Sequence, residues 1–170
     1  MEKIEESKSE INFILLSLGS NIGDKERTLN IAIDELKTQG IIVIDKISSF
    51  YFTEPYGVTE QDWFVNLCIY GTTILTPIQL LDKCKEIEIK MGRKERQRWH
   101  EREIDIDIIL FNDLVLDTEI LTIPHKEYKN RNFVLAPAAE IVGELIPSDS
   151  EYSISELAKL CNDKSGIKKI

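Results

Sequence analysis

The feature that most constrains the fold is the stretch at residues 104–111, which reads IDIDIILF. Apolar and acidic residues alternate through its first half, and a period of two is typical of a β-strand. Asp105 and Asp107 then project from the same face of a sheet, with Cα atoms about 6.6 Å apart, or two strand rises. The apolar second half, residues 108–111, predicts a strand that is central in its sheet and covered on both faces.

Two carboxylates at this spacing suit a pair of magnesium ions, which lie about 3.5–4 Å apart in two-metal sites. Alternating aspartates can also mark nothing more than a solvated face of a strand. Buried carboxylates, however, require cations or hydrogen-bond donors, because burying them unpaired is costly. Since residues 108–111 predict a covered strand, we expect Asp105 and Asp107 to bind metal.

A basic segment leads into this strand. Residues 92–103 contain four arginines and one lysine around a single Trp99. Such a run alone is often a solvated loop, but the chain as a whole is acidic, with a net charge of -9. General nucleic-acid binding is therefore not expected, and the local basic charge is more informative. Guanidinium groups match phosphate oxygens, and carboxylates hold the accompanying metal, so the segment and the strand together predict a polyphosphate site.

Composition places the chain in an ordinary class. Its 170 residues fit one domain, which we expect at 11–170 after a flexible extension at 1–10. Cys68, Cys84 and Cys161 form no C-x-x-C pair, so no disulfide framework or zinc site is predicted. They are expected to be buried thiols of a cytoplasmic protein. No apolar run reaches membrane-spanning length, so a membrane is not an expected partner.

Hydrophobic periodicity and turn residues predict the order strand, helix, strand, strand, helix, strand. The expected elements are a strand at 11–18, a helix capped by Asp24 and closed by Gly40, strands at 41–52 and 64–73, a helix that begins at Thr76 and Pro77 and closes at Gly92, and the strand at 104–111.

This order predicts an α+β fold with a ferredoxin-like βαββαβ core, in which both helices lie on one face of an antiparallel sheet. The short gap between the second and third strands favours a long hairpin. Beyond the core we expect a short strand or turn near residues 114–115 and helices at 133–139 and 154–161. The aspartate strand should lie beside the first strand, so that the loops after residue 18, at 53–62 and at 92–103 surround one cleft.

Several short motifs, in this order, resemble those of the 6-hydroxymethyl-7,8-dihydropterin pyrophosphokinase family over about residues 13–146. The matching pieces are Leu18-Gly19-Ser20-Asn21, residues 49–57 (SFYFTEPYG), Gly92-Arg93, Arg98-Trp99, Arg102, residues 104–108 (IDIDI), Pro124-His125 and residues 130–135 (NRNFVL). Each piece is weak alone, and their combination is specific.

The resemblance implies transfer of the β,γ-diphosphate of ATP to the hydroxymethyl oxygen of the dihydropterin, with release of AMP, in folate biosynthesis. It also implies two Mg²⁺ ions, held by Asp105 and Asp107. Charge on three linked phosphates must then be neutralised by metals and arginines, and no side-chain nucleophile is required. Asp107, or metal-bound hydroxide near it, is a weaker candidate for the group that receives the hydroxyl proton.

By position in the motifs, the resemblance also implies the residues of the ATP side. Glu88 alone would be a solvated residue on the polar face of its helix, and His125 alone could be a structural histidine. Lys126 stands where the family often has tyrosine. The implied catalytic residues are Arg93, Arg102, Asp105 and Asp107, and the implied ATP-binding residues are Glu88, Arg93, Arg98, Arg102, Thr122, His125, Lys126 and Arg131.

The acceptor is a flat ring that needs aromatic faces for stacking and a few polar groups at its edge. Phe64 and Phe133 are the implied stacking partners, although each alone would more often be a core aromatic, and Trp99 is expected to close over the ring. The implied pterin-binding residues are Gly19, Thr53, Pro55, Tyr56, Phe64, Asn66, Trp99 and Phe133.

The basic segment departs from the family pattern, with His100 and Glu101 where Gly-Pro is usual and Glu95 where a second arginine is common. These changes should affect loop closure rather than the metal pair. Two other functions fit parts of the sequence: a two-metal nucleotidyltransferase and an RNA-binding ferredoxin-like module. The first disagrees with the distance between Ser20 and Asp105 in sequence, and the second with the acidic total. We expect small-molecule substrates and a monomer.

Overall fold

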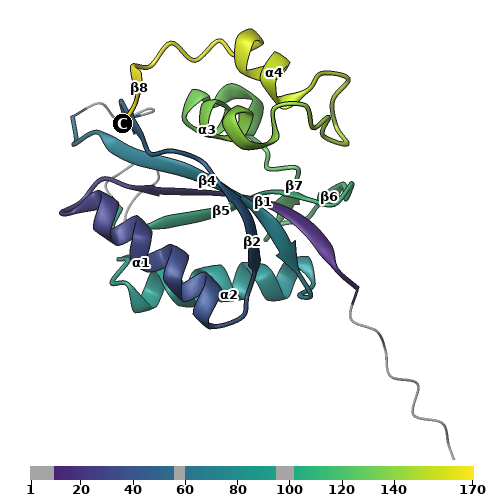
Figure 1. Ribbon diagram of the computed structural model, residues 1–170, viewed down its shortest axis with the longest axis horizontal. Coiled ribbons are helices and arrows are strands. Elements are labelled where there is room, and N and C mark those ends of the chain that lie inside the picture. The colour runs from purple at the N-terminus through teal and green to yellow at the C-terminus, as the bar shows by residue number, and fades with distance from the viewer. Residues whose placement is uncertain (1–9, 56–59, 95–101) are drawn as a thin grey trace, which may run out of the picture.

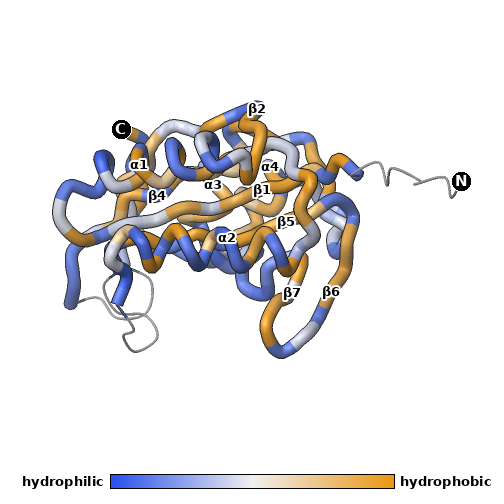
Figure 2. Tube along the Cα trace, turned by 90° about the horizontal axis from the view of Figure 1, so that it is seen from below, coloured by the Kyte–Doolittle hydropathy of each residue, from blue (hydrophilic) through white to orange (hydrophobic). Residues whose placement is uncertain are grey.

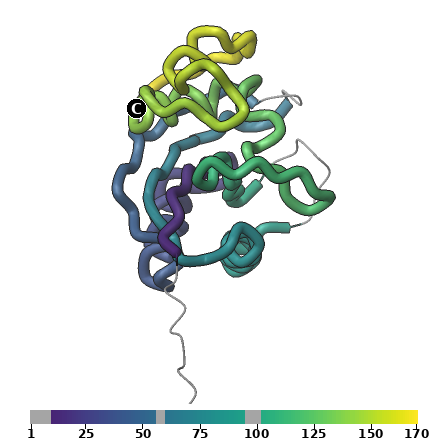
Figure 3. Tube along the Cα trace, turned by 90° about the vertical axis from the view of Figure 1, so that its right-hand side faces the viewer, coloured from purple at the N-terminus to yellow at the C-terminus, as the bar shows by residue number. Residues whose placement is uncertain are grey.

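A computed structural model describes residues 10–55, 60–94 and 102–170, and in it one antiparallel sheet separates two helical layers (Figure 1). Helices α1 (Lys25–Thr38) and α2 (Pro77–Lys90) lie side by side on one face. Helices α3 (Asn132–Val142) and α4 (Ile154–Leu160) cover the other, as the view from the side also shows (Figure 3). The predicted pair of helices on one face of an antiparallel sheet is therefore present, together with a further helical layer.

The sheet has the strand order β5-β1-β4-β3-β8, with β2 also paired to β4, and every pairing is antiparallel. The aspartate strand lies beside the first strand, as expected. The bounds are β1 (Asn12–Ser20), β2 (Val43–Ile47), β3 (Tyr51–Thr53), β4 (Phe64–Thr73), β5 (Asp105–Phe111) and β8 (Ile167–Lys169).

The prediction of one long strand at 41–52 is wrong, because the chain leaves strand geometry between β2 and β3. Ser48 accounts for the break: its backbone N–H donates to the Cys68 carbonyl, and its hydroxyl accepts from the Cys68 N–H, both at 2.9 Å. A side chain thus replaces part of the ladder. The register of β2 also shifts between Ile44 and Lys46.

Helix ends follow the predicted signals. Thr76 and Gln79 form a capping box at the start of α2, and the Asp24 carboxylate accepts from the Arg27 N–H at 3.1 Å at the start of α1. Gly40 and Gly92 follow the two helices with positive φ angles of 65° and 89°, which glycine adopts without strain. Figure 2 shows alternating hydrophobic and hydrophilic residues along α2, whose apolar side faces the sheet.

Each face of the sheet has its own hydrophobic core, and β5 contributes to both. Ile106 and Ile108 pack in the core under α1 and α2, whereas Ile109 and Leu110 pack in the core under α3 and α4. The prediction that this strand is covered on both faces is confirmed. Its predicted central position is wrong, because β5 is the edge strand of the sheet and pairs with β1 alone among the described strands.

The open edge of β5 is covered by the chain that follows it. A small hairpin, β6 (Leu116–Asp117) and β7 (Thr122–Ile123), replaces the strand or turn expected at 114–115. The His125 N–H then donates to the Ile109 carbonyl at 2.9 Å, which brings this histidine beside the aspartate strand.

The three cysteines are buried and free, as predicted. Within residues 10–55, 60–94 and 102–170, none of the helices has the length and apolar character needed to cross a membrane.

Candidate active site

Asp105 and Asp107 lie at the end of β5 where the polar loops of the sheet gather. In the antiparallel ladder Asp105 pairs with Gly19 and Asp107 pairs with Ser17, both on β1. Residues two apart on a strand share a face. The two aspartates therefore project together from the face of the sheet that α3 covers, since Leu15 of the same β1 face packs in the core under α3.

Two arginines from the basic segment hold Asp105. Arg93 Nη1 lies 3.1 Å from Asp105 Oδ1, and Arg102 Nη1 lies 2.7 Å from Asp105 Oδ2. Both oxygens of the carboxylate are thus paired with guanidinium groups, which are planar donors suited equally to phosphate. The predicted grouping of Arg93, Arg102 and Asp105 is present in the structure.

Glu88 of α2 pairs with Arg93 and so extends the group formed by Arg93, Arg102 and Asp105. The prediction that Glu88 is solvated on the polar face of its helix is wrong. Only 4% of the residue is exposed, because its carboxylate turns toward the sheet. One oxygen is paired with Arg93, and Oε1 accepts from the Ile106 backbone N–H at 2.7 Å. Burial followed by the charge of Asp105 raises the pKa of Glu88 to about 7.

Asp107 faces a second pair of basic side chains. Its Oδ2 lies 3.9 Å from His125 Nε2 and 3.9 Å from Arg131 Nη1. Burial and the nearby Asp105 carboxylate raise the pKa of Asp107 to about 7. The sheet thus keeps two carboxylates close enough to repel each other, an arrangement that a bound cation relieves.

His125 is held as a neutral imidazole. Burial and then the Arg131 charge lower the pKa of His125 to about 4. The Glu127 N–H donates to His125 Nδ1 at 3.1 Å, so the ring proton is assigned to Nε2, the atom that faces Asp107. A neutral histidine in this place can donate one hydrogen bond to an anion without adding charge.

The donor set fits magnesium bound together with a polyphosphate. Magnesium is commonly held by one or two carboxylates, with waters and phosphate oxygens completing its shell. Asp105 and Asp107 provide such a pair. Within the described part of the chain, no cluster of three or more His, Cys, Asp or Glu side chains forms a closed metal cage, so an all-protein site is not indicated.

Asn21 joins the three loops that were expected to surround one site. Only 1% of this residue is exposed. Its backbone N–H donates to the Arg102 carbonyl at 3.2 Å, and its Oδ1 accepts from the Arg102 N–H at 2.8 Å. Its Nδ2 donates to Gln61 Oε1 at 3.0 Å and to the Asp62 carbonyl at 3.1 Å. This role was missed from the sequence, although Asn21 is the last residue of the motif after the first strand.

The polar residues implied for the pterin, Asn66 and Thr53, lie on β4 and β3. Asn66 of β4 pairs with Gly19 of β1, and its Nδ2 donates to Thr53 Oγ1 at 2.7 Å. A Cβ atom at position 19 would lie 2.3 Å from Asn66 Oδ1 and 3.8 Å from Phe64 Cδ1. The glycine is therefore required by the close approach of the Asn66 side chain, and the structure brings Gly19, Thr53, Phe64 and Asn66 together.

The remaining predicted residues lie on several separate elements or outside the described residues. Phe133 is half-buried at the start of α3, with the Arg131 guanidinium 5.6 Å from its ring centre. Thr122 lies in β7, where its hydroxyl donates to Asp117 at 3.1 Å, and Lys126 is exposed. Pro55 is buried at the end of β3. The predictions for Tyr56, Arg98 and Trp99, like the departures at Glu95, His100 and Glu101, lie outside the described residues.

The family model for 7,8-dihydro-6-hydroxymethylpterin-pyrophosphokinase (HPPK) matches residues 15–143. The chain belongs to this family. It is 43% identical over 156 residues to the 2-amino-4-hydroxy-6-hydroxymethyldihydropteridine pyrophosphokinase of Methylorubrum extorquens, covering 91% of this chain and 96% of that HPPK relative. It is 38% identical over 157 residues to the protein of the same name from Bacillus subtilis, covering 92% and 94%.

Other HPPK relatives are longer. The chain is 44% identical over 140 residues to the Bifunctional protein FolKE of Lactococcus lactis, covering 82% of this chain but 39% of that protein. Among solved structures, the wild-type HPPK-DHPS of Plasmodium falciparum with pteroate has a TM-score of 0.72 at 17% identity, covering 89% of this chain and 42% of that one. That likeness shows the fold.

Proposed function

We propose that the chain transfers the β,γ-diphosphate of ATP to the hydroxymethyl oxygen of 6-hydroxymethyl-7,8-dihydropterin and releases AMP, as a step of folate biosynthesis. Membership of the HPPK family supports the reaction. The observation that carries it is the position of Gly19, which pairs with Asp105 on one side and with Asn66 on the other. The aspartates of β5, assigned to the metal ions and phosphate, and Asn66 of β4, assigned to the acceptor ring, are thus separated by the single strand β1.

Arg93, Arg102 and Arg131 are the residues that would neutralise the triphosphate. In the structure these arginines are directed at Asp105 and Asp107. A phosphate group, like a carboxylate, presents a pair of anionic oxygens that can accept two hydrogen bonds from one guanidinium, so the arginines can exchange one anion for the other. His125 would donate from Nε2 to a phosphate oxygen, since its lowered pKa leaves it uncharged near neutral pH.

Asp105 and Asp107 would hold two Mg²⁺ ions that accompany ATP. When bound, magnesium would supply neutralisation of the phosphate charge that develops during transfer and would lower the pKa of the attacking hydroxyl. Asp107, or metal-bound hydroxide near it, would be the weaker candidate for receiving the hydroxyl proton.

The acceptor side would recognise the ring by shape and by edge contacts. Asn66 Nδ2 donates a hydrogen bond to Thr53 Oγ1, and Asn66 Oδ1 points toward Gly19. This oxygen would accept a hydrogen bond from the edge of the ring. Phe64 and Phe133 would stack on the two faces of the ring. Most of the rate enhancement then comes from orientation and charge, as is usual in phosphoryl transfer.

The proposal also covers the fold of the core, the number of domains, the oligomeric state and the cellular compartment. The order β5-β1-β4 followed by β3 supports a ferredoxin-like core. We also infer a single catalytic domain over residues 11–170, a monomer, and action in the cytoplasm. The nucleotidyltransferase and RNA-binding alternatives are not favoured by the family comparisons.

The products of the reaction provide the test. ATP, Mg²⁺ and the hydroxymethyl dihydropterin should give AMP and the pterin diphosphate in equal amounts, and omission of the pterin should abolish AMP formation. Release of pyrophosphate would indicate nucleotidyl transfer instead. Salt-sensitive RNA binding without any ATP turnover would support the third alternative.

A further inference from the structure

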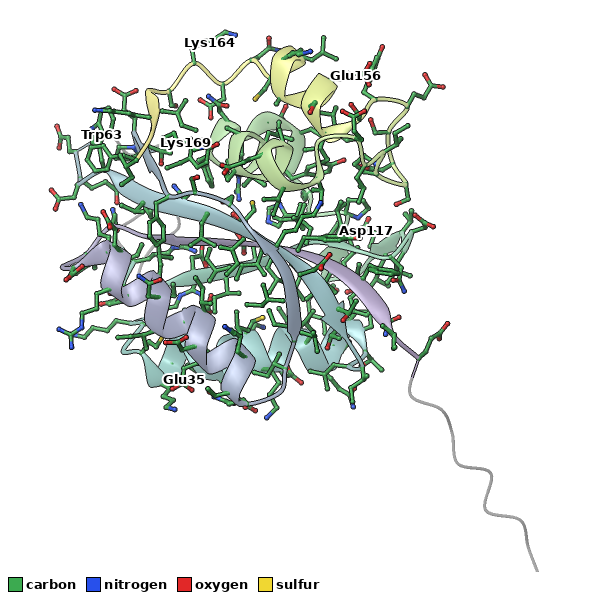
Figure 4. The ribbon with its side chains drawn as sticks, in the orientation of Figure 1. Glu35, Trp63, Asp117, Glu156, Lys164 and Lys169 are labelled. Atoms are coloured by element: carbon green, nitrogen blue, oxygen red, sulfur yellow. The ribbon has the colours of Figure 1, made fainter. Side chains whose placement is uncertain are left out.

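The last ten residues of the chain lie beyond the family match at 15–143, yet they bond to the two segments that carry Thr53 and Phe133, both assigned to the acceptor ring. Residues 161–170 leave α4, run along the start of α3 and end as β8 on the outer edge of β3 (Figure 1). Trp63 and Lys169 mark this end of the sheet in Figure 4. We call residues 161–170 the C-terminal strap.

One end of the strap is fixed to the segment that carries Thr53 and Pro55. Thr53 pairs with Ile167 of β8 on one side and with Phe64 of β4 on the other. Just beyond this pair, the Glu54 N–H donates to the Gly166 carbonyl at 2.9 Å, and the Gly166 N–H donates to the Glu54 carboxylate. Without β8, the three-residue β3 would be an exposed edge strand.

The other end of the strap holds the start of α3. Arg131, the N-cap residue, forms no side-chain capping hydrogen bond. Asp163 takes this role from outside the helix, because its Oδ2 accepts from the Asn132 N–H at 3.0 Å. A carboxylate is favourable at a helix N-terminus, where N–H groups lack partners within the helix. Asn132 directly precedes Phe133, the implied stacking residue.

A single hydrogen-bonded path joins the two ends. The second oxygen of Asp163 accepts from the Ser165 N–H at 2.9 Å, and Ser165 precedes Gly166, which is bonded to Glu54. The two oxygens of Asp163 therefore bond to different parts of the chain, one to Ser165 within the strap and the other to Asn132 at the start of α3. This path links the Thr53–Pro55 segment to the start of α3, whereas Glu140 near the other end of that helix bonds Ser49 and Tyr51 directly.

We propose that Asp163 is a positioning residue for the acceptor subsite, and that the C-terminal strap sets the width of the slot for the pterin ring. The proposal rests on the proposed function. A flat ring binds best between walls that are already at the right distance, because ordering them on binding costs affinity. Arg93, Arg102 and Asp105 are bonded to one another away from this path, whereas Arg131, also assigned to the triphosphate, directly precedes Asn132. Loss of Asp163 should therefore weaken pterin binding more than ATP binding.

The test measures the two ligands separately on Asp163→Ala. The Kd of the hydroxymethyl dihydropterin, measured in the presence of a non-hydrolysable ATP analogue, should rise about tenfold, the effect of about one lost hydrogen bond to a charged group. The Kd of the ATP analogue should rise by less than about threefold, because Arg93 and Arg102 keep their contacts with Asp105. KM for the pterin should rise while kcat at saturation is retained, and Asp163→Asn, which keeps one acceptor oxygen, should restore part of the affinity.

Glu54→Ala breaks the opposite end of the path and should reproduce the selective loss, even if Asp163→Ala folds poorly. Glu156→Ala is the matched control, since this carboxylate also accepts from a backbone N–H, that of Ser153, but only caps α4. Folded Asp163→Ala or Glu54→Ala with wild-type pterin affinity, or with equal losses for both ligands, would overturn the proposal. A wild-type protein that binds no pterin and forms no AMP would instead refute the proposed function itself.

Discussion

The phosphate side and the acceptor side of the proposed site are held by different kinds of interaction. On β5, Asp105 is fixed by ion pairs to Arg93 and Arg102. Around β3 and β4, Thr53 and Asn66 are fixed by strand pairing and by a hydrogen bond between their side chains. Ion pairs can be exchanged for phosphate and metal, whereas the walls of an aromatic slot must stay where they are.

The two sides also differ in how well their polar groups are satisfied. Asp107 and Glu88 have pKa values raised to about 7, because burial and the nearby Asp105 carboxylate destabilise their charged forms. On the acceptor side, Tyr51 donates to Glu140 at 2.7 Å, and this carboxylate also accepts from Ser49. The phosphate side thus holds carboxylates whose charged forms are destabilised by burial, while Glu140 beside the acceptor side is paired with hydroxyl donors.

The largest effect is expected from the metal pair. Asp107→Ala should lower the rate of AMP formation by at least about 10³-fold, because the charge of the transferring group loses its principal stabilisation. Asp105→Ala should behave alike. Both rates are measured with saturating ATP, Mg²⁺ and pterin. Asp82→Ala, which removes an exposed carboxylate of α2, is the control and should leave the rate unchanged. Near-normal AMP release from either active-site variant would argue against metal binding at these positions.

Glu88→Gln should show how much the buried Glu88 carboxylate lowers the free energy of unfolding as the pH rises. A carboxyl whose pKa rises from 4.5 to about 7 on folding contributes its full stabilisation below pH 4.5 and loses it as the pH approaches 7. Relative to Glu88→Gln, the wild-type protein should therefore lose up to about 1.4 kcal/mol of unfolding free energy per pH unit in that range. Urea unfolding of both proteins, without nucleotide or magnesium, measures this difference. A difference independent of pH would contradict the assignment.

Gly19→Ala tests the contact between the two sides. The added Cβ would lie 2.3 Å from Asn66 Oδ1 and must displace that side chain, so the Kd of the pterin should rise about thirtyfold, or about 2 kcal/mol. Gly40→Ala is the control, because this glycine has a positive φ but no neighbour within 4 Å of a Cβ. It should lower stability and leave pterin affinity intact. Equal affinities for the two variants would show that Asn66 does not contact the ring.

Tyr51→Phe should give the smallest effect. Burial raises the pKa of Tyr51, which keeps its hydroxyl protonated as a donor to Glu140. Loss of this hydrogen bond should lower the free energy of unfolding by about 1 kcal/mol, with little change in the affinity for either substrate. Chemical denaturation and calorimetry of the two ligands measure both quantities. A large loss of ATP affinity would mean that the two sides are not independent.

Much of this arrangement follows from local sequence signals. The period-two pattern at 104–111, the capping box at Thr76 and the glycines after both core helices are short-range features, and the structure confirms them. The expectation that the aspartate strand lies beside the first strand also followed from strand order alone. Each of these predictions depends on residues that are neighbours in the chain or on a simple rule of connection.

The predictions that were wrong, and the features that were missed, depend on partners distant in sequence. Glu88 appears polar and exposed on a helical wheel, but Arg93 and the Ile106 N–H satisfy its carboxylate in the interior. The break at Ser48 depends on its bonds to Cys68. Asn21 joins loops separated by 40 and 81 positions in the chain. Neither periodicity nor composition contains this information.

The most direct test of the central claim is a crystal structure with a non-hydrolysable ATP analogue, Mg²⁺ and the hydroxymethyl dihydropterin. We predict metal ions bound to Asp105 and Asp107, phosphate oxygens on Arg93 and Arg102, and the ring stacked between Phe64 and Phe133 with its edge at Asn66. Carboxylates facing solvent without metal, on the opposite side of the sheet from the bound ring, would contradict the account.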